Sequence, residues 1–174
     1  MTRQLHTEEP ELENIEQLLP PGFLRNPVHF LAFGFGSGCM AQAPGTWGTL
    51  AALPVYACFF WVPLPVYLGI VALAFVVGIW LCGRTAKTLK VHDHGGIVWD
   101  EFVGMWLVLA IRPDTWYWLV LAVVLFRFFD ILKPWPIGWL DRRVGGGFGI
   151  MLDDILAGLY ALVSLYLAIY FIAP

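Results

Sequence analysis

Long uncharged stretches separated by short polar segments dominate the hydropathy pattern of this chain. Residues 64–82 and 155–174 carry no charged side chain. At a rise of about 1.5 Å per residue, each is long enough to cross a hydrocarbon core of about 30 Å. Residues 49–62, 102–111 and 115–126 are also apolar but shorter. The pattern predicts an all-α, polytopic helical membrane protein with about four to five hydrophobic membrane segments, some of them short or re-entrant.

Polar residues divide the chain into two parts. Residues 1–25 contain five glutamates and are interpreted as an acidic cytosolic N-terminal tail, and residues 26–174 as a single helical membrane domain. The tail lacks a basic region followed by an apolar run, so a cleaved signal peptide is not expected. Most Lys and Arg residues of the domain lie in residues 84–101 and 127–154. The positive-inside rule places both windows on the cytoplasmic side.

Composition narrows the class of protein further. The chain is 59% hydrophobic and 13% charged, with a mean hydropathy of +0.73. A soluble domain is typically about 45–50% apolar and about 25% charged, so these values argue against a soluble protein, a disordered chain and a nucleic-acid binder. The net charge of −3 comes from the tail, because residues 26–174 contain eight acids and eight bases. The three cysteines lie in apolar sequence and are expected to be free thiols.

Two pairs of adjacent carboxylates stand where apolar runs begin. Asp100 and Glu101 occur in HDHGGIVWDEFVG, and Asp153 and Asp154 in GGGFGIMLDDILAG. Either pair alone could cap a helix N-terminus and complement its dipole. Two pairs at one membrane face favour metal binding instead, because carboxylate oxygens from different helices are the ligands that Mg²⁺ prefers. Acids near hydrocarbon are also costly unless paired or metal-bound, so we expect these four residues to bind Mg²⁺.

A third polar group lies in RFFDILKPWPI. Asp130 has Arg127 and Lys133 three residues away on either side, a spacing that also suits simple i,i+3 ion pairs. The functional interpretation makes Asp130 a further ligand or a base, and lets the Arg127 guanidinium and the Lys133 ammonium hold phosphate. Arg142 could bind a lipid phosphate too, although membrane topology explains its charge equally well.

A glycine-containing segment, APGTWGT, precedes the first of the apolar stretches. The backbone N–H groups around Gly45 and the hydroxyl group of Thr46 could bind an oxyanion. The alternative is an ordinary helix cap and turn, since the spacing does not match the phosphate-binding loop of nucleotide-binding proteins.

Motifs of several other phosphatase classes do not occur in this sequence. No cysteine is followed six positions later by arginine, and neither Asp-x-Asp-x-Thr nor Gly-x-Ser-x-Gly is found. Among phosphatase mechanisms, this leaves catalysis by carboxylates with a bound metal ion.

The chain resembles the phosphatidylglycerophosphatase A family in four sequence blocks. They run in order through residues 26–158: GFGSGCMAQAPGTWGTLAALP, TAKTLKVHDHGGIVWDEFVGMW, FRFFDILKPWPIGWLDR and GGFGIMLDDILAG.

The resemblance implies a Mg²⁺-dependent, all-helical lipid phosphatase of the bacterial inner membrane. Such an enzyme converts phosphatidylglycerophosphate to phosphatidylglycerol and inorganic phosphate. The working hypothesis assigns three sets of residues: Asp100, Glu101, Asp130 and Asp154 to catalysis; Asp100, Glu101, Asp153 and Asp154 to Mg²⁺; and Arg127, Lys133, Thr46, Gly45 and Arg142 to the substrate phosphate. The rivals are a cation-coupled transporter, which would place acids near span midpoints, and a lipid phosphotransferase.

Overall fold

The computed structural model describes residues 19–172, and every regular element in this part of the chain is helical. The expected all-α fold is therefore confirmed for these residues. In chain order the elements are η1 (Phe23–Arg25), α2 (Pro27–Ala32), η2 (Gly34–Cys39), α3 (Pro44–Ala57), α4 (Leu64–Leu89), α5 (Trp99–Val108), η3 (Leu109–Ile111), α6 (Trp116–Leu132), α7 (Ile137–Asp141) and α8 (Gly146–Ile172).

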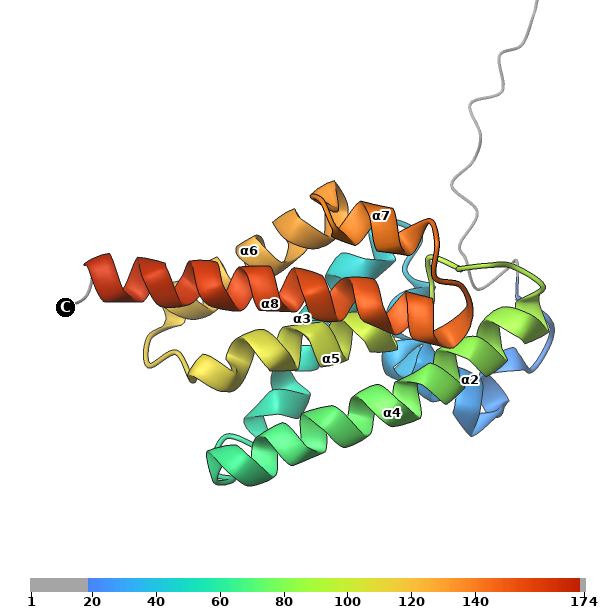
Figure 1. Cartoon of the computed structure of the whole chain (residues 1–174). Coiled ribbons are helices and arrows are strands. Elements are labelled where there is room, and N and C mark those ends of the chain that lie inside the picture. The colour runs from blue at the N-terminus through green and yellow to red at the C-terminus, as the bar shows by residue number, and fades with distance from the viewer. Residues whose placement is uncertain (1–18, 173–174) are drawn as a thin grey trace, which may run out of the picture.

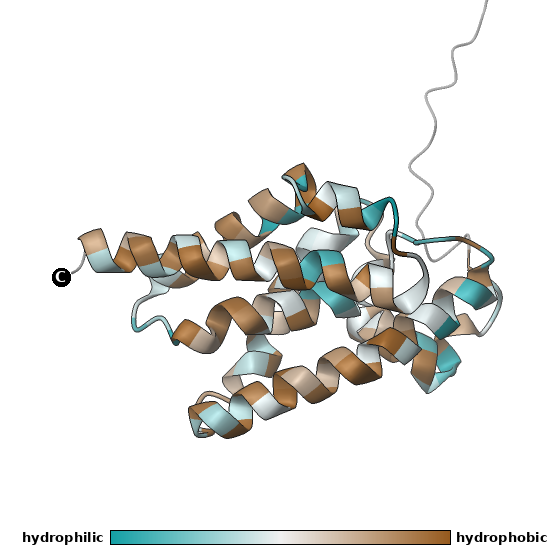
Figure 2. Cartoon of the chain, viewed as in Figure 1, coloured by the Kyte–Doolittle hydropathy of each residue, from teal (hydrophilic) through white to brown (hydrophobic). Residues whose placement is uncertain are grey.

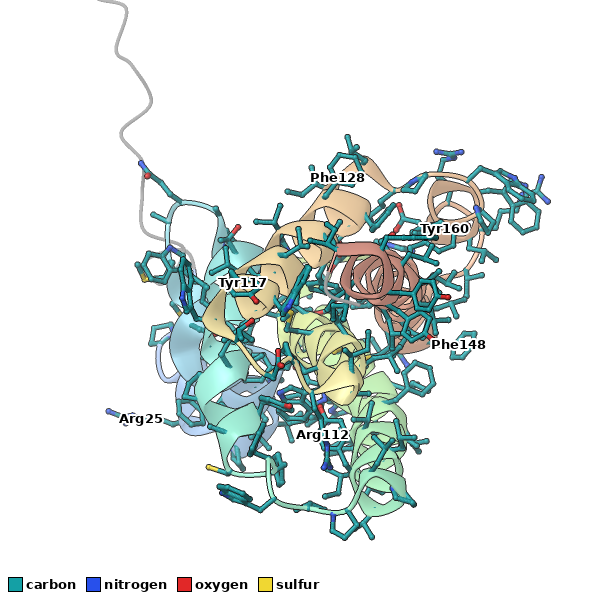
Figure 3. The ribbon with its side chains drawn as sticks, turned by 90° about the vertical axis from the view of Figure 1, so that its left-hand side faces the viewer. Arg25, Arg112, Tyr117, Phe128, Phe148 and Tyr160 are labelled. Carbon is teal, nitrogen blue, oxygen red and sulfur yellow. The ribbon has the colours of Figure 1, made fainter. Side chains whose placement is uncertain are left out.

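Helix α5 lies at the centre of the bundle, surrounded by α3, α4, α6 and α8 (Figure 3). All of its residues except Leu107 are buried. Helices α5 and α8 run in the same direction, whereas α4 and α6 run the opposite way (Figure 1). The starts of α5 and α8 therefore share one end of the bundle with the ends of α4 and α6. This polar end, with the loops 90–98 and 133–145, contains many of the hydrophilic residues (Figure 2).

Two of the described helices, α4 and α8, are long and apolar enough to cross a membrane, judged by length and composition alone. The predicted four to five membrane segments are therefore too many for the described part of the chain. The other apolar stretches form α3, α5 and α6, which have 14, 10 and 17 residues. At about 1.5 Å per residue these helices fall short of a hydrocarbon core of about 30 Å. Helix α5 is apolar because the protein itself surrounds it.

Glycines let α8 approach two neighbouring helices closely. A Cβ on Gly104 of α5 would lie 2.8 Å from the backbone oxygen of Asp154, and one on Gly158 would lie 2.8 Å from the backbone oxygen of Gly104. A Cβ on Gly147 would likewise overlap the backbone of α4 at Ile79. Small residues at helix crossings allow such close backbone contact. The acidic segments of α5 and α8 are thereby brought within reach of each other.

The opposite end of the bundle, the far end, contains the loop 58–63, the segment 109–115 and the last turns of α8 (Figure 1). Two tyrosines of α3 and α4 donate hydrogen bonds into the last part of the central helix and η3. The Tyr67 hydroxyl donates to the backbone oxygen of Trp106 at 2.6 Å, and the Tyr56 hydroxyl donates to that of Leu109 at 3.2 Å. The indole N–H of Trp106 donates to the backbone oxygen of Ala52 at 3.0 Å.

The expected acidic tail falls mostly outside the described residues, because its five glutamates all lie within residues 1–18. Of the remainder of that segment, the Phe23 ring is buried and stacks on His29 with ring centroids 4.2 Å apart. Residues 19–25 therefore include an anchor of the helical domain.

Candidate active site

Three carboxylates from two helices meet near the polar end. Asp100 and Glu101 come from the first turn of α5, and Asp154 comes from α8; one oxygen of each lies within 4.8 Å of the others. These residues, called the carboxylate cluster below, are each at most 9% exposed. Helix α8 begins at Gly146, two turns before Asp154. Asp154 therefore cannot cap the N-terminus of this helix, which removes the alternative interpretation for that residue.

The carboxylate cluster holds more negative charge than the surrounding side chains neutralise. Burial, followed by the charge of Glu101, raises the pKa of Asp100 well above its usual range. Burial and the Asp154 carboxylate raise the pKa of Glu101 to about 8, although Arg127 acts in the opposite direction. Two carboxylate neighbours in a buried site cannot readily both be ionised without a cation.

Two oxygens of the carboxylate cluster also lack a hydrogen-bond partner among the described residues. They are Oε2 of Glu101 and Oδ2 of Asp154, and both are buried. Because buried polar atoms in proteins are almost always paired, each exception needs an explanation. Three hard oxygen donors with two orphaned atoms fit a divalent cation such as Mg²⁺, whose remaining positions are usually taken by water and substrate phosphate.

Arg127 of α6 lies directly beside the carboxylate cluster. Its Nη1 atom is 2.6 Å from Oδ2 of Asp130 and 3.6 Å from Oε1 of Glu101. The i,i+3 ion pair that the sequence suggested is therefore present, and the same guanidinium also reaches the cluster. Asp130 holds Arg127 in this orientation, so the two residues act as one unit at the edge of the cluster.

Lys133 lies between two other carboxylates. Its Nζ atom is 2.6 Å from Oδ2 of Asp153 and 3.1 Å from Oδ1 of Asp141. Burial disfavours the charge of Lys133, but its bonds to Asp153 and Asp141 outweigh that cost and raise its pKa. Neighbouring residues on a helix point about 100° apart. Asp153 consequently faces Lys133, while Asp154 faces Asp100 and Glu101.

Asp141, at the end of α7, is a residue that sequence reasoning did not single out. It stands eight positions after Lys133, beyond any helical spacing that would pair the two. Its presence within the block FRFFDILKPWPIGWLDR is the one signal that could have drawn attention to it.

The three remaining residues of the hypothesis are placed differently. Gly45, in the first turn of α3, lies against the cluster: a Cβ there would overlap Oε1 of Glu101 and lie 2.8 Å from Nη1 of Arg127. The first turn of a helix favours nearby negative charge. Thr46 follows it and is half-buried. Arg142 is exposed just after α7, and among the described residues it forms no hydrogen bond or ion pair with the cluster.

Together these groups can carry out one kind of chemistry. Carboxylates able to hold a divalent cation lie beside a fixed guanidinium, and both would attract a phosphate group. The arrangement suits metal-assisted hydrolysis of a phosphate ester.

Comparisons with known proteins relate this chain to phosphatases. The family model described as phosphatidylglycerophosphatase A matches residues 30–169. The chain is 49% identical over 144 residues to the phosphatidylglycerophosphatase A of Escherichia coli K12, covering 82% of this chain and 84% of that protein. It is 49% identical over 145 residues to the protein of the same name in Haemophilus influenzae, covering 82% of this chain and 89% of the relative.

A third relative carries a different name. A protein of Bacteroides thetaiotaomicron named for phosphatidylinositol-3-phosphatase activity is 38% identical over 156 residues, covering 85% of this chain and 95% of that protein. No solved structure matches this chain.

Proposed function

The chain belongs to the phosphatidylglycerophosphatase A family, and we propose that it removes the terminal phosphate of phosphatidylglycerophosphate with Mg²⁺ bound by Asp100, Glu101 and Asp154. The products are phosphatidylglycerol and inorganic phosphate. The observation that carries the metal assignment is the convergence of three buried carboxylates, two of which keep an orphaned oxygen. Membership of a phosphatase family favours hydrolysis over cation-coupled transport and over phosphoryl transfer to an alcohol.

Each residue around the carboxylate cluster has a role in this proposal. When bound, Mg²⁺ supplies a positive charge that polarises a phosphoryl oxygen and lowers the pKa of a water molecule. Arg127 neutralises the charge that develops on the phosphoryl group, and Asp130 keeps its guanidinium in place. The proton of the attacking water goes to a carboxylate that does not bind the metal: Asp130, or Glu101 if Asp100 and Asp154 alone hold the Mg²⁺.

Lys133 is proposed as a second contact to the phosphate. An ammonium group has three N–H donors, and two of those of Lys133 are directed to Asp153 and Asp141. The third donor is available to a phosphoryl oxygen. In this proposal Asp153 acts by holding Lys133. Of the four residues expected to bind Mg²⁺, it therefore has the least support as a ligand. The backbone around Gly45, the Thr46 hydroxyl and Arg142 remain as further proposed phosphate contacts.

We further propose that the protein is embedded in the bacterial inner membrane, with its polar end at the cytoplasmic surface. Large apolar residues on the outer faces of α4 and α8 support this location, because they are more than half exposed: Val66, Leu73, Val76, Val163 and Tyr166. A lipid environment accommodates such surfaces, which soluble proteins rarely show over a large contiguous area. The Lys and Arg residues that gather at the polar end support the orientation.

The test is release of inorganic phosphate from phosphatidylglycerophosphate by the purified protein in detergent. We expect release with Mg²⁺, loss of release with a chelator, and recovery when excess Mg²⁺ is added. Equal release with and without chelator would refute the metal assignment. Phosphatidic acid and phosphatidylinositol 3-phosphate serve as comparison substrates and define the head-group preference. Asp114→Asn is a matched control, because Asp114 is an exposed aspartate in the loop at the far end.

A further inference from the structure

An apolar groove with a volume of about 410 Å³ lies between α4, α5 and α8. Its size falls within the range of about 300–1,000 Å³ that is typical of small-molecule sites. The walls include Leu68, Val71 and Phe75 of α4, Leu107 of α5, and Ile155 and Leu159 of α8, and no charged residue lines it. The groove therefore suits a hydrocarbon chain and offers nothing to a polar ligand.

The groove begins at the level of the carboxylate cluster along the bundle and leads away from it. Ile155 follows Asp154 directly on α8, and Leu159 lies one turn further on. Leu107 comes seven residues after Asp100, which places both on the same face of α5. Because α5 and α8 run in the same direction (Figure 1), the groove extends from the level of the cluster towards the far end.

The position of the groove selects one occupant. A lipid whose phosphate reaches the carboxylate cluster must direct its hydrocarbon towards the far end, along the apolar faces of α4 and α8. The groove is continuous with that path. We propose that it holds one acyl chain of the phospholipid substrate while the terminal phosphate is bound at the cluster. This inference rests on the proposed function and adds the subsite that orients the lipid.

The groove orients its ligand and adds little to the driving force for binding. Lipid tails are as apolar as leucine side chains, so a chain gains no hydrophobic free energy when it leaves its lipid neighbours for the groove. A chain fixed in the groove does restrict where the head group lies relative to the catalytic residues. Blocking the groove should therefore affect the hydrolysis of lipids whose chains are long enough to enter it.

Leu159→Trp fills the groove, and Leu167→Trp is its matched control. Both leucines lie on α8 with similar exposure, 42% and 46%, but Leu167 does not line the groove. The two variants are compared with wild type on phosphatidylglycerophosphate with sixteen-carbon chains and on the soluble form with six-carbon chains. For Leu159→Trp we expect kcat/KM to fall about tenfold on the long-chain substrate and to stay unchanged on the short-chain one. Leu167→Trp should match wild type on both.

Ala72→Leu provides a milder block from α4 if Leu159→Trp fails to fold, because Ala72 is an exposed residue of the same groove. Equal kcat/KM values for Leu159→Trp and Leu167→Trp on the long-chain substrate would overturn the inference, as would an equal loss on both substrates. Either result leaves the proposed function intact, because it is obtained with an active wild-type enzyme. A wild-type protein that releases no phosphate from either substrate would refute the proposed function and the groove together.

Discussion

Two sets of buried polar groups, one towards each end of this helical bundle, differ in whether they have hydrogen-bond partners. At the far end, the hydroxyl groups of Tyr56 and Tyr67 and the indole of Trp106 each donate a hydrogen bond to a backbone oxygen of a neighbouring element. Near the polar end, Glu101 and Asp154 keep buried oxygens without a hydrogen-bond partner among the described residues. Paired groups stabilise a fold, whereas unpaired buried charge destabilises it.

The presence or absence of hydrogen-bond partners distinguishes residues that stabilise the fold from those proposed to bind a ligand. The three hydrogen bonds of Tyr56, Tyr67 and Trp106 connect α3, α4 and the α5–η3 segment, and these donors need no further partner. Under the proposed function, the polar groups of the carboxylate cluster bind a metal ion, and their arrangement would lower the stability of the metal-free protein. Substitutions at the two ends should therefore change different quantities. Three predictions, in order of decreasing effect, test this contrast.

The largest effect is expected for Asp154→Asn. The substitution keeps the shape of the side chain but removes a negative charge from the carboxylate cluster. We expect phosphate release to fall by about 10²–10³-fold, the range seen when one charge-stabilising group is lost from an active site. Thermal unfolding without metal should stay at the wild-type temperature or move higher, because repulsion with Glu101 is relieved.

Tyr67→Phe is the matching change at the far end. It removes the hydrogen bond to the backbone oxygen of Trp106 and should destabilise the protein by about 1 kcal/mol. Activity per folded molecule should be retained. The contrast between the two ends would be broken if Asp154→Asn kept wild-type turnover, or if Tyr67→Phe lost activity while its unfolding temperature was unchanged.

An intermediate effect is expected for Gly45→Ala. The added Cβ would overlap Oε1 of Glu101 and press on Arg127, so these two groups must shift by a fraction of an ångström. A displacement of about 1 Å can cost about 10²-fold in rate, so a loss between about tenfold and a hundredfold is expected in kcat.

Gly69→Ala on α4 is the control for this substitution. An added Cβ at Gly69 meets nothing within 4 Å, and alanine in a helix interior is more stable than glycine by about 0.5–1 kcal/mol. Gly69→Ala should therefore retain full kcat and unfold at the same or a slightly higher temperature. If both variants had the same kcat, Gly45 would have no part in the site.

The smallest effect is a dependence of stability on pH in the absence of metal. The pKa of Glu101 rises from its usual 4.5 to about 8 in the folded protein, chiefly through burial and the Asp154 charge. An acid with a raised pKa in the folded state favours folding most at low pH. Its contribution is lost as the pH increases from about 4.5 to about 8, because the unfolded chain then releases its proton more readily.

The unfolding temperature of the chelated protein in detergent should therefore decrease as the pH increases from about 5 to about 8. Mg²⁺ should raise the unfolding temperature more at the upper end of this interval, since cation binding requires the ionised carboxylates. Glu101→Gln should weaken both dependences without abolishing them, because the pKa of Asp100 is raised as well. A chelated wild-type protein that becomes more stable over the same interval would contradict the assignment.

Much of the architecture was predictable from local sequence, but the number of membrane segments was not. Residues 64–82 and 155–174 were expected to be spans, and they lie within or largely within α4 and α8, the two described helices that are long enough. The stretch 102–111 has similar composition, yet it forms most of α5 and η3 at the centre of the bundle. Hydropathy records the apolar character of a segment and does not distinguish burial in lipid from burial in protein.

The sequence by itself determined the helical class, the family and the residue types gathered at one end of the domain. Only the tertiary structure decided which acids join the carboxylate cluster and which pair with a basic side chain. Asp153 and Asp154 are adjacent and chemically identical, but they point about 100° apart on α8. The close contact between Gly104 and Gly158 turns Asp154 towards α5, while Asp153 meets Lys133. Which carboxylate can take part in the cluster thus depends on the rotation of one helix against its neighbours, and no local pattern of residues specifies that rotation.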